Sequence, residues 1–347
     1  MDRPNPRHIP QLDALRGIAA LMVLVSHSAN AQLLPSYLGN GFGRMGVGLF
    51  FVLSAFLLTT LYAGKRPDAS AVWHYSVKRV ARVLPLFYAA LAGSWAMVAV
   101  TGISIFSAFD TLEVFLGNAL LISGTSVLWS IPVEIHFYVC FIGFWILAQI
   151  RTSLGIAFLV ALQIALLVIA EFFEFRTDSL PYWMHFFTFG VVLALLAERH
   201  WSFVSSHKLF ALGPVIAVLA TPVLLPGLRA DVWGLDHGPI FRDPITVSWI
   251  FLFSAAFVFA FIPTYFLQSR VFKFLGEVSF SVYLFHLLPI WAFTTLIPKD
   301  IFFQGDRFVC VLVVTLLGSY FITRLFERPA QRFIVRALNS KKTSFAT

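Results

Sequence analysis

The chain has 347 residues, of which 59% are hydrophobic and 12% are charged, and its mean hydropathy is +0.83. Soluble domains carry roughly twice that share of charged residues, about 25%, and the interior of a soluble protein of this length could not bury so many apolar side chains. The composition therefore excludes an ordinary soluble protein and favours a chain that crosses a bilayer several times. The two cysteines, Cys140 and Cys310, lie in apolar runs and predict neither a disulfide framework nor a metal site.

About ten apolar runs approach the length of about 20 residues that a helical membrane span needs. They lie near Leu12–Ala31, Met45–Tyr62, Val80–Val100, Val127–Ile150, Leu154–Phe173, Tyr182–Ala197, Leu209–Leu225, Ile245–Leu267, Phe274–Leu296 and Phe308–Phe326. The run Leu112–Ile122 is shorter and is interpreted as a re-entrant, interfacial or eleventh spanning segment. We expect an all-α fold, a polytopic membrane helical bundle of about 10–11 transmembrane helices around a central polar cavity, forming one integral-membrane domain over residues 1–347.

Basic residues lie mostly on one side of these spans. With the N-terminus in the cytoplasm, most of the 25 Lys and Arg residues fall in cytoplasmic segments, whereas acidic residues gather on the other side. Cytoplasmic loops of membrane proteins carry such an excess of positive charge. We therefore predict a multi-pass protein of the inner (plasma) membrane with both termini in the cytoplasm. The net charge of +8 is attributed to topology rather than to nucleic-acid binding.

The first predicted span contains three ionisable residues, Asp13, Arg16 and His27. Arg16 and His27 are close to three helical turns apart, so they share one face at a separation of roughly 16 Å along the axis. Asp13 and Arg16 can pair across one turn. Ionisable groups at membrane depth are costly and usually face a cavity or a partner, which favours a polar stripe leading to His27. The alternative is a capped helix start with an interfacial histidine.

Glu134 follows Trp129 in the fourth predicted span and shares a helix face with Tyr138. A carboxylate inside an apolar run needs a partner, and His27 is expected at the same outer depth. A carboxylate beside an imidazole raises its basicity and fixes its tautomer. The alternative is a structural hydrogen bond from Glu134 to another helix.

The ninth predicted span places Ser279, Tyr283 and His286 on one face. Each of these residues is more often a contact between helices than a catalytic group. We therefore interpret them as substrate-binding or structural residues, with His286 structural or substrate-positioning.

Lys78, Arg79 and Arg82 form a compact basic cluster at the expected start of the third span. Such a cluster suits a ligand with several phosphates, held by charge-assisted hydrogen bonds. The alternative is anchoring on anionic lipid.

Six segments, taken in order, resemble the acyltransferase-3 family of membrane acyltransferases. They are Leu12–Ala20 followed by His27, Gly46–Phe56, Lys78–Pro85, Leu128–Tyr138, Gly276–His286 and Glu327–Pro329. The family usually has glycine at the position of Ala55 and tyrosine at that of Phe280. Pro132 is expected to disturb the helix before Glu134.

The resemblance implies transfer of an acyl group from acyl-CoA, expected to be acetyl-CoA, to a hydroxyl of a surface or lipid-linked saccharide. His27 would be the catalytic histidine, acting as a general base oriented by Glu134 or as a covalent acyl carrier. Arg16, Lys78, Arg79 and Arg82 would bind the CoA. Asp13, Trp129, Ser279, Tyr283 and His286 are assigned to substrate binding or structure. No permanently bound cofactor and no metal are expected, and a stand-alone form without a hydrolase-like domain is expected.

A membrane exporter of a glycan or a small acylated solute is the alternative function. Such transporters also carry intramembrane charges, but they are built from broken helices and inverted repeats. The sequence shows neither feature clearly.

Overall fold

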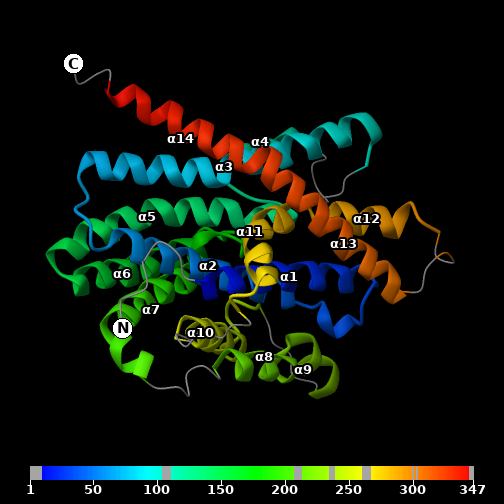
Figure 1. Cartoon of the computed structure of the whole chain (residues 1–347), viewed down its shortest axis with the longest axis horizontal. Coiled ribbons are helices and arrows are strands. Elements are labelled where there is room, and N and C mark those ends of the chain that lie inside the picture. The colour runs from blue at the N-terminus through cyan, green and yellow to red at the C-terminus, as the bar shows by residue number, and fades with distance from the viewer. Residues whose placement is uncertain are drawn as a thin grey trace. The chain divides into compact units, whose positions relative to one another are not determined.

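The computed structural model describes residues 10–103, 111–206, 213–233, 239–259, 267–298, 301 and 304–343. The chain is 84% helical, and the described part contains no strand (Figure 1). The α-helices are α1 (Pro10–Asn30), α2 (Phe42–Tyr62), α3 (Ala69–Thr101), α4 (Leu112–Ala119), α5 (Ser130–Ile150), α6 (Thr152–Phe172), α7 (Leu180–Ser206), α8 (Gly213–Leu224), α9 (Pro226–Trp233), α10 (Pro244–Val258), α11 (Arg270–Phe285), α12 (Leu287–Thr295), α13 (Gln304–Ile322) and α14 (Arg328–Thr343). Short 3-10 helices are η1 (Ser36–Leu38) and η2 (Ser126–Trp129), and the π-helical turn η4 (Thr323–Glu327) joins α13 to α14.

Within the described residues, seven helical segments are long and apolar enough to cross a membrane. They are Gln11–Asn30, Ser36–Tyr62, Ala69–Thr101, Ser126–Ile150, Thr152–Phe172, Leu180–Arg199 and Gly305–Asn339. The bent pair α11–α12 gives an eighth if it is one span, and α10 is a shorter apolar helix. The predicted fold class, a polytopic helical membrane protein, is confirmed. Parts of the predicted spans Leu209–Leu225 and Ile245–Leu267 lie outside the described residues.

The run Leu112–Ile122 forms only the eight-residue helix α4. At 1.5 Å per residue such a helix is about 12 Å long, whereas the hydrocarbon core is about 30 Å thick. The option of an eleventh span is therefore wrong for this segment.

The predicted ninth span is not one straight helix. It consists of α11 and α12, which meet at His286 with a bend of 56°. Pro289 lies in the first turn of α12 and has no N–H to donate to the carbonyl of Phe285, so it removes one helical hydrogen bond at the bend. The predicted segment is therefore a broken helix, a feature that the sequence did not show clearly.

Two other local predictions are also corrected. The basic cluster lies in the third turn of α3 and onward, not at a helix start, because Asp68 caps the helix earlier by accepting a hydrogen bond from the Ala71 N–H at 2.8 Å. Pro132 does not disturb α5. It lies in the first turn, where its missing N–H would have no intrahelical partner.

The chain divides into two compact units. Unit 1 comprises Met1–Tyr62 and Trp183–Thr315, and unit 2 comprises Ala63–Tyr182 and Leu316–Thr347. In unit 1, α1 packs against α2 and α11; in unit 2, α5 packs against α6, and α14 runs along α3 (Figure 1). The single integral-membrane domain predicted over residues 1–347 stays a prediction, as does the central polar cavity.

Glycines allow the close helix contacts of unit 1. A Cβ added at Gly46 of α2 would lie 2.6 Å from the carbonyl oxygen of Ala19 in α1. One added at Gly190 of α7 would lie 2.9 Å from the Cβ of Ala55 in α2. Small residues in membrane helices let backbones approach in this way, so the segment Gly46–Phe56 packs against α1 on one side and α7 on another.

Candidate functional site: a histidine pair and a basic groove

Unit 1 brings together two histidines that are far apart in the sequence, His27 near the end of α1 and His286 at the bend between α11 and α12. Their ring centroids are 5.1 Å apart and the rings are tilted by 59°. His286 is fully buried, whereas His27 is half-buried. Of these two histidines, the sequence predicted a catalytic role for His27, together with Glu134, and left His286 as structural or substrate-positioning. The contact between them comes from the packing of α1 on α11.

The His286 ring is fixed by the backbone of α11. Its Nδ1 lies 3.0 Å from the carbonyl oxygen of Val282 and 2.9 Å from that of Tyr283. Carbonyl oxygens only accept, so Nδ1 carries a hydrogen and donates it. In the neutral ring Nε2 then carries a lone pair. That atom is buried and has no hydrogen-bond partner among the described residues.

The other two residues predicted on this face of α11 are also buried. The Ser279 hydroxyl donates to the Gly276 carbonyl at 2.8 Å and so satisfies its own helix. Tyr283 packs edge-on against Phe50 of α2, with ring centroids 6.0 Å apart, and its ring is 6.5 Å from that of His286. Tyr283 thus lies beside the histidine pair, whereas Ser279 serves local helix structure.

Asp13 and Arg16 lie in the first two turns of α1, and both are half-buried. The backbone of Asp13 lies directly against Gly276 of α11. This end of α1 is therefore held against the helix that carries Tyr283 and is followed by His286. The predicted pairing of Asp13 with Arg16, and the polar channel lined by Arg16, stay predictions.

Glu134 and Trp129 belong to unit 2. The Tyr138 hydroxyl donates to Glu134 Oε1 at 2.5 Å, and the Tyr75 hydroxyl of α3 donates to the Tyr138 carbonyl at 2.9 Å. Trp129 is buried at the end of η2. The shared face of Glu134 and Tyr138 that the sequence predicted is confirmed. The pairing of Glu134 with His27 stays a prediction, since the two residues belong to different units.

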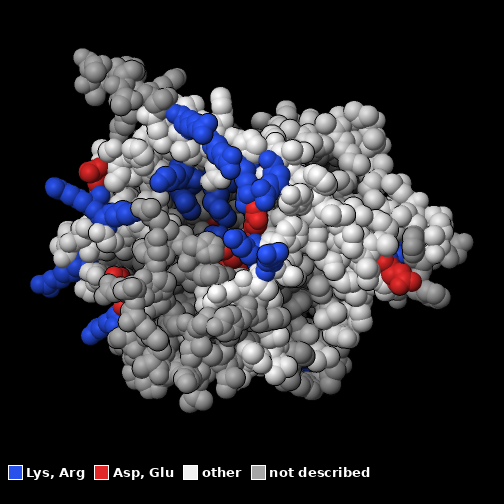
Figure 2. Space-filling model, in the orientation of Figure 1, with Lys and Arg blue, Asp and Glu red and all other residues white. Residues whose placement is uncertain are grey.

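The helix α3, which carries the basic cluster, has a neighbouring helix that the sequence analysis did not predict. The helix α14 packs along α3 and carries arginines at positions 328, 332 and 336, spaced four residues apart on one face. Figure 2 shows Lys and Arg side chains gathered on the face where Figure 1 places α14. A pocket of about 550 Å³ is lined there by Pro329, Arg332, Phe333, Arg336 and Ala337. The four-residue spacing was the available signal, but these arginines had been assigned to membrane topology alone.

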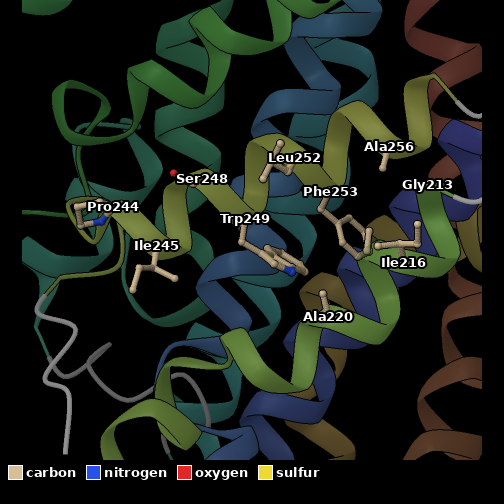
Figure 3. A pocket seen from close by; sticks show the side chains of 11 residues that line it. Gly213, Ile216, Ala220, Pro244, Ile245, Ser248, Trp249, Leu252, Phe253 and Ala256 are labelled. Atoms are coloured by element: carbon tan, nitrogen blue, oxygen red, sulfur yellow. The ribbon is translucent and has the colours of Figure 1, made fainter. Parts of the chain in front are cut away.

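A second pocket in unit 1 lies between α8 and α10 (Figure 3). It encloses about 590 Å³, and none of its lining residues carries a charge. The indole of Trp249 lines it, and its Nε1 is buried without a hydrogen-bond partner among the described residues. An apolar groove of this kind offers nothing for a CoA phosphate, and it contains none of the predicted site residues.

A buried ion pair joins α9 to the start of α10 and was not predicted. Arg229 and Asp243 are 2% and 6% exposed and are hydrogen-bonded to each other, and Arg229 also donates to the Thr246 hydroxyl at 2.8 Å. Burial alone would raise the pKa of Asp243, but its hydrogen bonds with Arg229 and Thr246 outweigh burial and hold the pKa below its usual value. Because the two buried charges neutralise each other, this pair is a structural link rather than a reactive group.

Fold and site together define a multi-pass helical membrane protein with a histidine pair inside one unit and a basic surface on the other. The sequence model of the acyltransferase-3 family, described as an acyltransferase domain, matches residues 9–324, and the chain belongs to this family.

Similar proteins carry matching names. The chain is 24% identical over 375 residues to the O-acetyltransferase OatA of Staphylococcus aureus, a match covering 97% of the chain but 58% of that relative. It is 24% identical over 289 residues to ORF330 of Acidianus two-tailed virus, provisionally named an acetyltransferase, covering 80% of the chain and 82% of the relative. The chain thus spans little more than half the length of the OatA relatives it matches. No solved structure matches it significantly.

Proposed function

We propose that this protein is a membrane O-acyltransferase that moves an acyl group, most simply acetyl, from acyl-CoA to a hydroxyl of a surface or lipid-linked saccharide. The observation that carries the proposal is a half-buried histidine, His27, in contact with a fully buried and hydrogen-bonded one in a member of an acyltransferase family. The names of the relatives support acetyl as the transferred group.

His27 acts as the general base. It takes the proton from the acceptor hydroxyl as the hydroxyl oxygen attacks the thioester carbonyl, and it returns that proton to the departing thiolate of CoA. One C–O bond forms, one C–S bond breaks, and the proton ends on sulfur. Such a base contributes about 10²–10⁴-fold to the rate. The carboxylate of Glu134, held by Tyr138, is assigned to stabilising the positive charge on the imidazole.

The phosphates of CoA bind to Lys78, Arg79 and Arg82 of α3 together with Arg332 and Arg336 of α14. Support comes from the packing of α14 along α3 and from the pocket lined by the two arginines of α14. Guanidinium groups bind phosphate oxygens through paired, charge-assisted hydrogen bonds. The excess of positive charge on one side of the spans supports a location in the inner membrane, with the basic residues of α3 and α14 facing the cytoplasm.

The test uses purified protein in lipid nanodiscs with radiolabelled acetyl-CoA and a saccharide acceptor. Both acetylated saccharide and free CoA thiol are measured. The proposal predicts that both appear for the wild type and are lost in His27→Ala. The matched control is His136→Asn, which changes an exposed histidine outside the proposed machinery and should retain turnover. Turnover that persists in His27→Ala would contradict the proposal.

A covalent acyl-His27 intermediate is the alternative route within the same function. Incubation with labelled acetyl-CoA in the absence of acceptor distinguishes the two routes. Label retained on the protein, with one thiol released per molecule, indicates the covalent route, whereas no thiol release indicates direct transfer.

The exporter remains a second candidate because of one observation, the 56° bend between α11 and α12. Broken helices are typical of transporters. Movement of an unmodified glycan into vesicles, without any release of CoA thiol, would favour that function over acyl transfer.

A further inference from the structure

The mechanism above gives no role to the buried Nε2 atom of His286. This side chain is 0% exposed, and its Nδ1 is already committed to the carbonyls of Val282 and Tyr283. A buried polar atom without a partner is costly, and native proteins retain few of them. The nearest polar ring is that of His27, 5.1 Å away between centroids.

We propose that His286 is a positioning residue for His27: its Nε2 lone pair accepts a hydrogen bond from one ring N–H of His27 and leaves the other His27 nitrogen unprotonated for the reaction. The inference rests on the proposed function, which it deepens. His286 is held by two hydrogen bonds, whereas His27 is half-buried and has its ring centroid 5.1 Å from that of His286. The fixed ring therefore directs the movable one.

The bend between α11 and α12 allows His286 to make both sets of contacts. Because the helix breaks after Phe285, the His286 side chain can lie against the last carbonyls of α11 and still face α1. A neutral histidine tethered through Nδ1 can only accept at Nε2. Partners that orient a reactive histidine in this way set which of its nitrogens carries the proton.

The proton balance of the transfer is unchanged by this arrangement. When the free nitrogen of His27 takes the proton of the acceptor hydroxyl, the ring becomes an imidazolium whose other N–H still donates to His286 Nε2. When that proton passes to the departing thiolate, both rings return to their starting states. His286 gains and loses no proton, and it touches neither substrate.

Glu134 is the alternative residue that could fix the His27 tautomer, because the sequence analysis assigned that role to its carboxylate. The two assignments make different predictions for single substitutions. If His286 fixes the tautomer, Glu134→Gln lowers turnover without changing which His27 nitrogen carries the proton. If Glu134 fixes it, the same substitution changes the tautomer and His286→Asn does not.

Two substitutions at His286 distinguish loss of the hydrogen bond accepted by Nε2 from a general loss of folding. His286→Asn keeps an amide donor close to the position of Nδ1, so it can still bond the carbonyls of Val282 and Tyr283, but it has no acceptor at the position of Nε2. His286→Gln reaches the position of Nε2 and restores an acceptor there. The matched control is His185→Asn in α7, which alters a histidine outside the pair whose buried Nε2 also has no hydrogen-bond partner among the described residues.

The experiment measures kcat, the KM for acetyl-CoA and the tautomer of His27 by solid-state NMR of nanodisc samples with ¹⁵N-labelled histidine. The chain has nine histidines, and the signals absent from His27→Asn identify those of His27. We expect one His27 tautomer in the wild type and a mixture in His286→Asn. We also expect kcat to fall about 10–100-fold in that variant, as for other orienting partners of reactive histidines, with KM unchanged. His286→Gln should retain most of the wild-type turnover, and His185→Asn should retain all of it.

An unchanged His27 tautomer in His286→Asn would overturn the inference, as would equal loss of turnover in the Asn and Gln variants. If His286→Asn does not fold, the wild-type spectrum decides alone: an N–H···N coupling between the two rings supports the pair, and its absence overturns it. A wild type that transfers no acetyl group but shows that coupling would contradict the proposed function and leave the histidine pair standing.

Discussion

Gly276 of α11 lies directly against the backbone of Asp13 in α1, so that a Cβ at position 276 would overlap the Asp13 carbonyl oxygen. The same crossing places Gly17 against Leu275, where an added Cβ would be 2.6 Å from the Leu275 Cβ. Two glycines, one on each helix, therefore set how close α1 and α11 approach. The distance between His27 and His286 depends on that approach, because the two histidines lie farther along the same two helices.

Gly276→Ala is expected to push α11 away from α1. Overpacking at a tight contact costs about 1–3 kcal/mol, so the thermal midpoint in detergent should fall and acetyl transfer should fall with it. Gly93→Ala in α3 is the matched control, since among the described residues no atom beyond the helix's own nearby backbone lies within 4 Å of the added Cβ. A Gly276→Ala protein as stable and active as the wild type would show that this crossing does not set the histidine pair.

Arg82→Gln and Arg332→Gln are each expected to raise the KM for acetyl-CoA about tenfold while leaving kcat little changed. A hydrogen bond to a charged group contributes about 1.5–3 kcal/mol, and phosphate recognition affects donor binding rather than the transfer step. Steady-state kinetics with acetyl-CoA and with its dephospho analogue measure the effect. Arg151→Gln, an exposed arginine at the start of α6, is the control. If Arg332→Gln leaves the KM for acetyl-CoA unchanged and weakens only binding to anionic vesicles, then α14 binds lipid and not acetyl-CoA.

Tyr138→Phe is expected to lower kcat without unfolding the protein. The substitution removes the hydroxyl that donates to Glu134 at 2.5 Å but keeps the buried ring. Loss of such a hydrogen bond costs about 1.5–3 kcal/mol when the acceptor is charged. Turnover and the thermal midpoint are measured side by side with Glu134→Gln. A Tyr138→Phe enzyme with normal kcat would remove the support for Glu134 as a catalytic carboxylate.

Asp243→Asn is expected to be strongly destabilising because it leaves Arg229 buried without its counter-ion. Removing one partner of a buried pair costs about 3–5 kcal/mol. The matched control is Asp178→Asn, which breaks the ion pair with Arg176 at 2.8 Å, where the arginine side chain is 62% exposed. Surface pairs contribute about 0–1 kcal/mol, so this control should unfold close to the wild-type temperature.

The same ion pair predicts a pH dependence. The folded-state pKa of Asp243 is lower than its usual value, so the pair contributes its full stability above the usual aspartate range. That contribution is lost as the pH falls through the lower, folded-state pKa. Thermal unfolding between neutral and acidic pH should therefore show a loss of stability that is smaller in Asp243→Asn. An equal loss of thermal stability in the wild type and Asp243→Asn would show that groups other than Asp243 cause the acid sensitivity.

The amino-acid sequence by itself determined the membrane character and the helical class, and it supplied most of the candidate site residues. Apolar runs, charge asymmetry and the polar residues of the first span are local properties, and helical periodicity converts them into faces. That is why the shared face of Glu134 and Tyr138 and the reactive candidate His27 could be named in advance. The spacing within one segment was sufficient for the shared face, whereas the catalytic role of His27 came from the resemblance to the acyltransferase-3 family.

Only the tertiary structure decided which faces meet. The bend at His286, the contact of His286 with His27 and the alignment of α14 with α3 join residues separated by long stretches of chain. Periodicity within a helix cannot specify its neighbour, because in a membrane every helix presents similar apolar surface to lipid and to protein. The choice rests on small-residue contacts such as Gly276 against Asp13, whose effect exists only when both helices are in place.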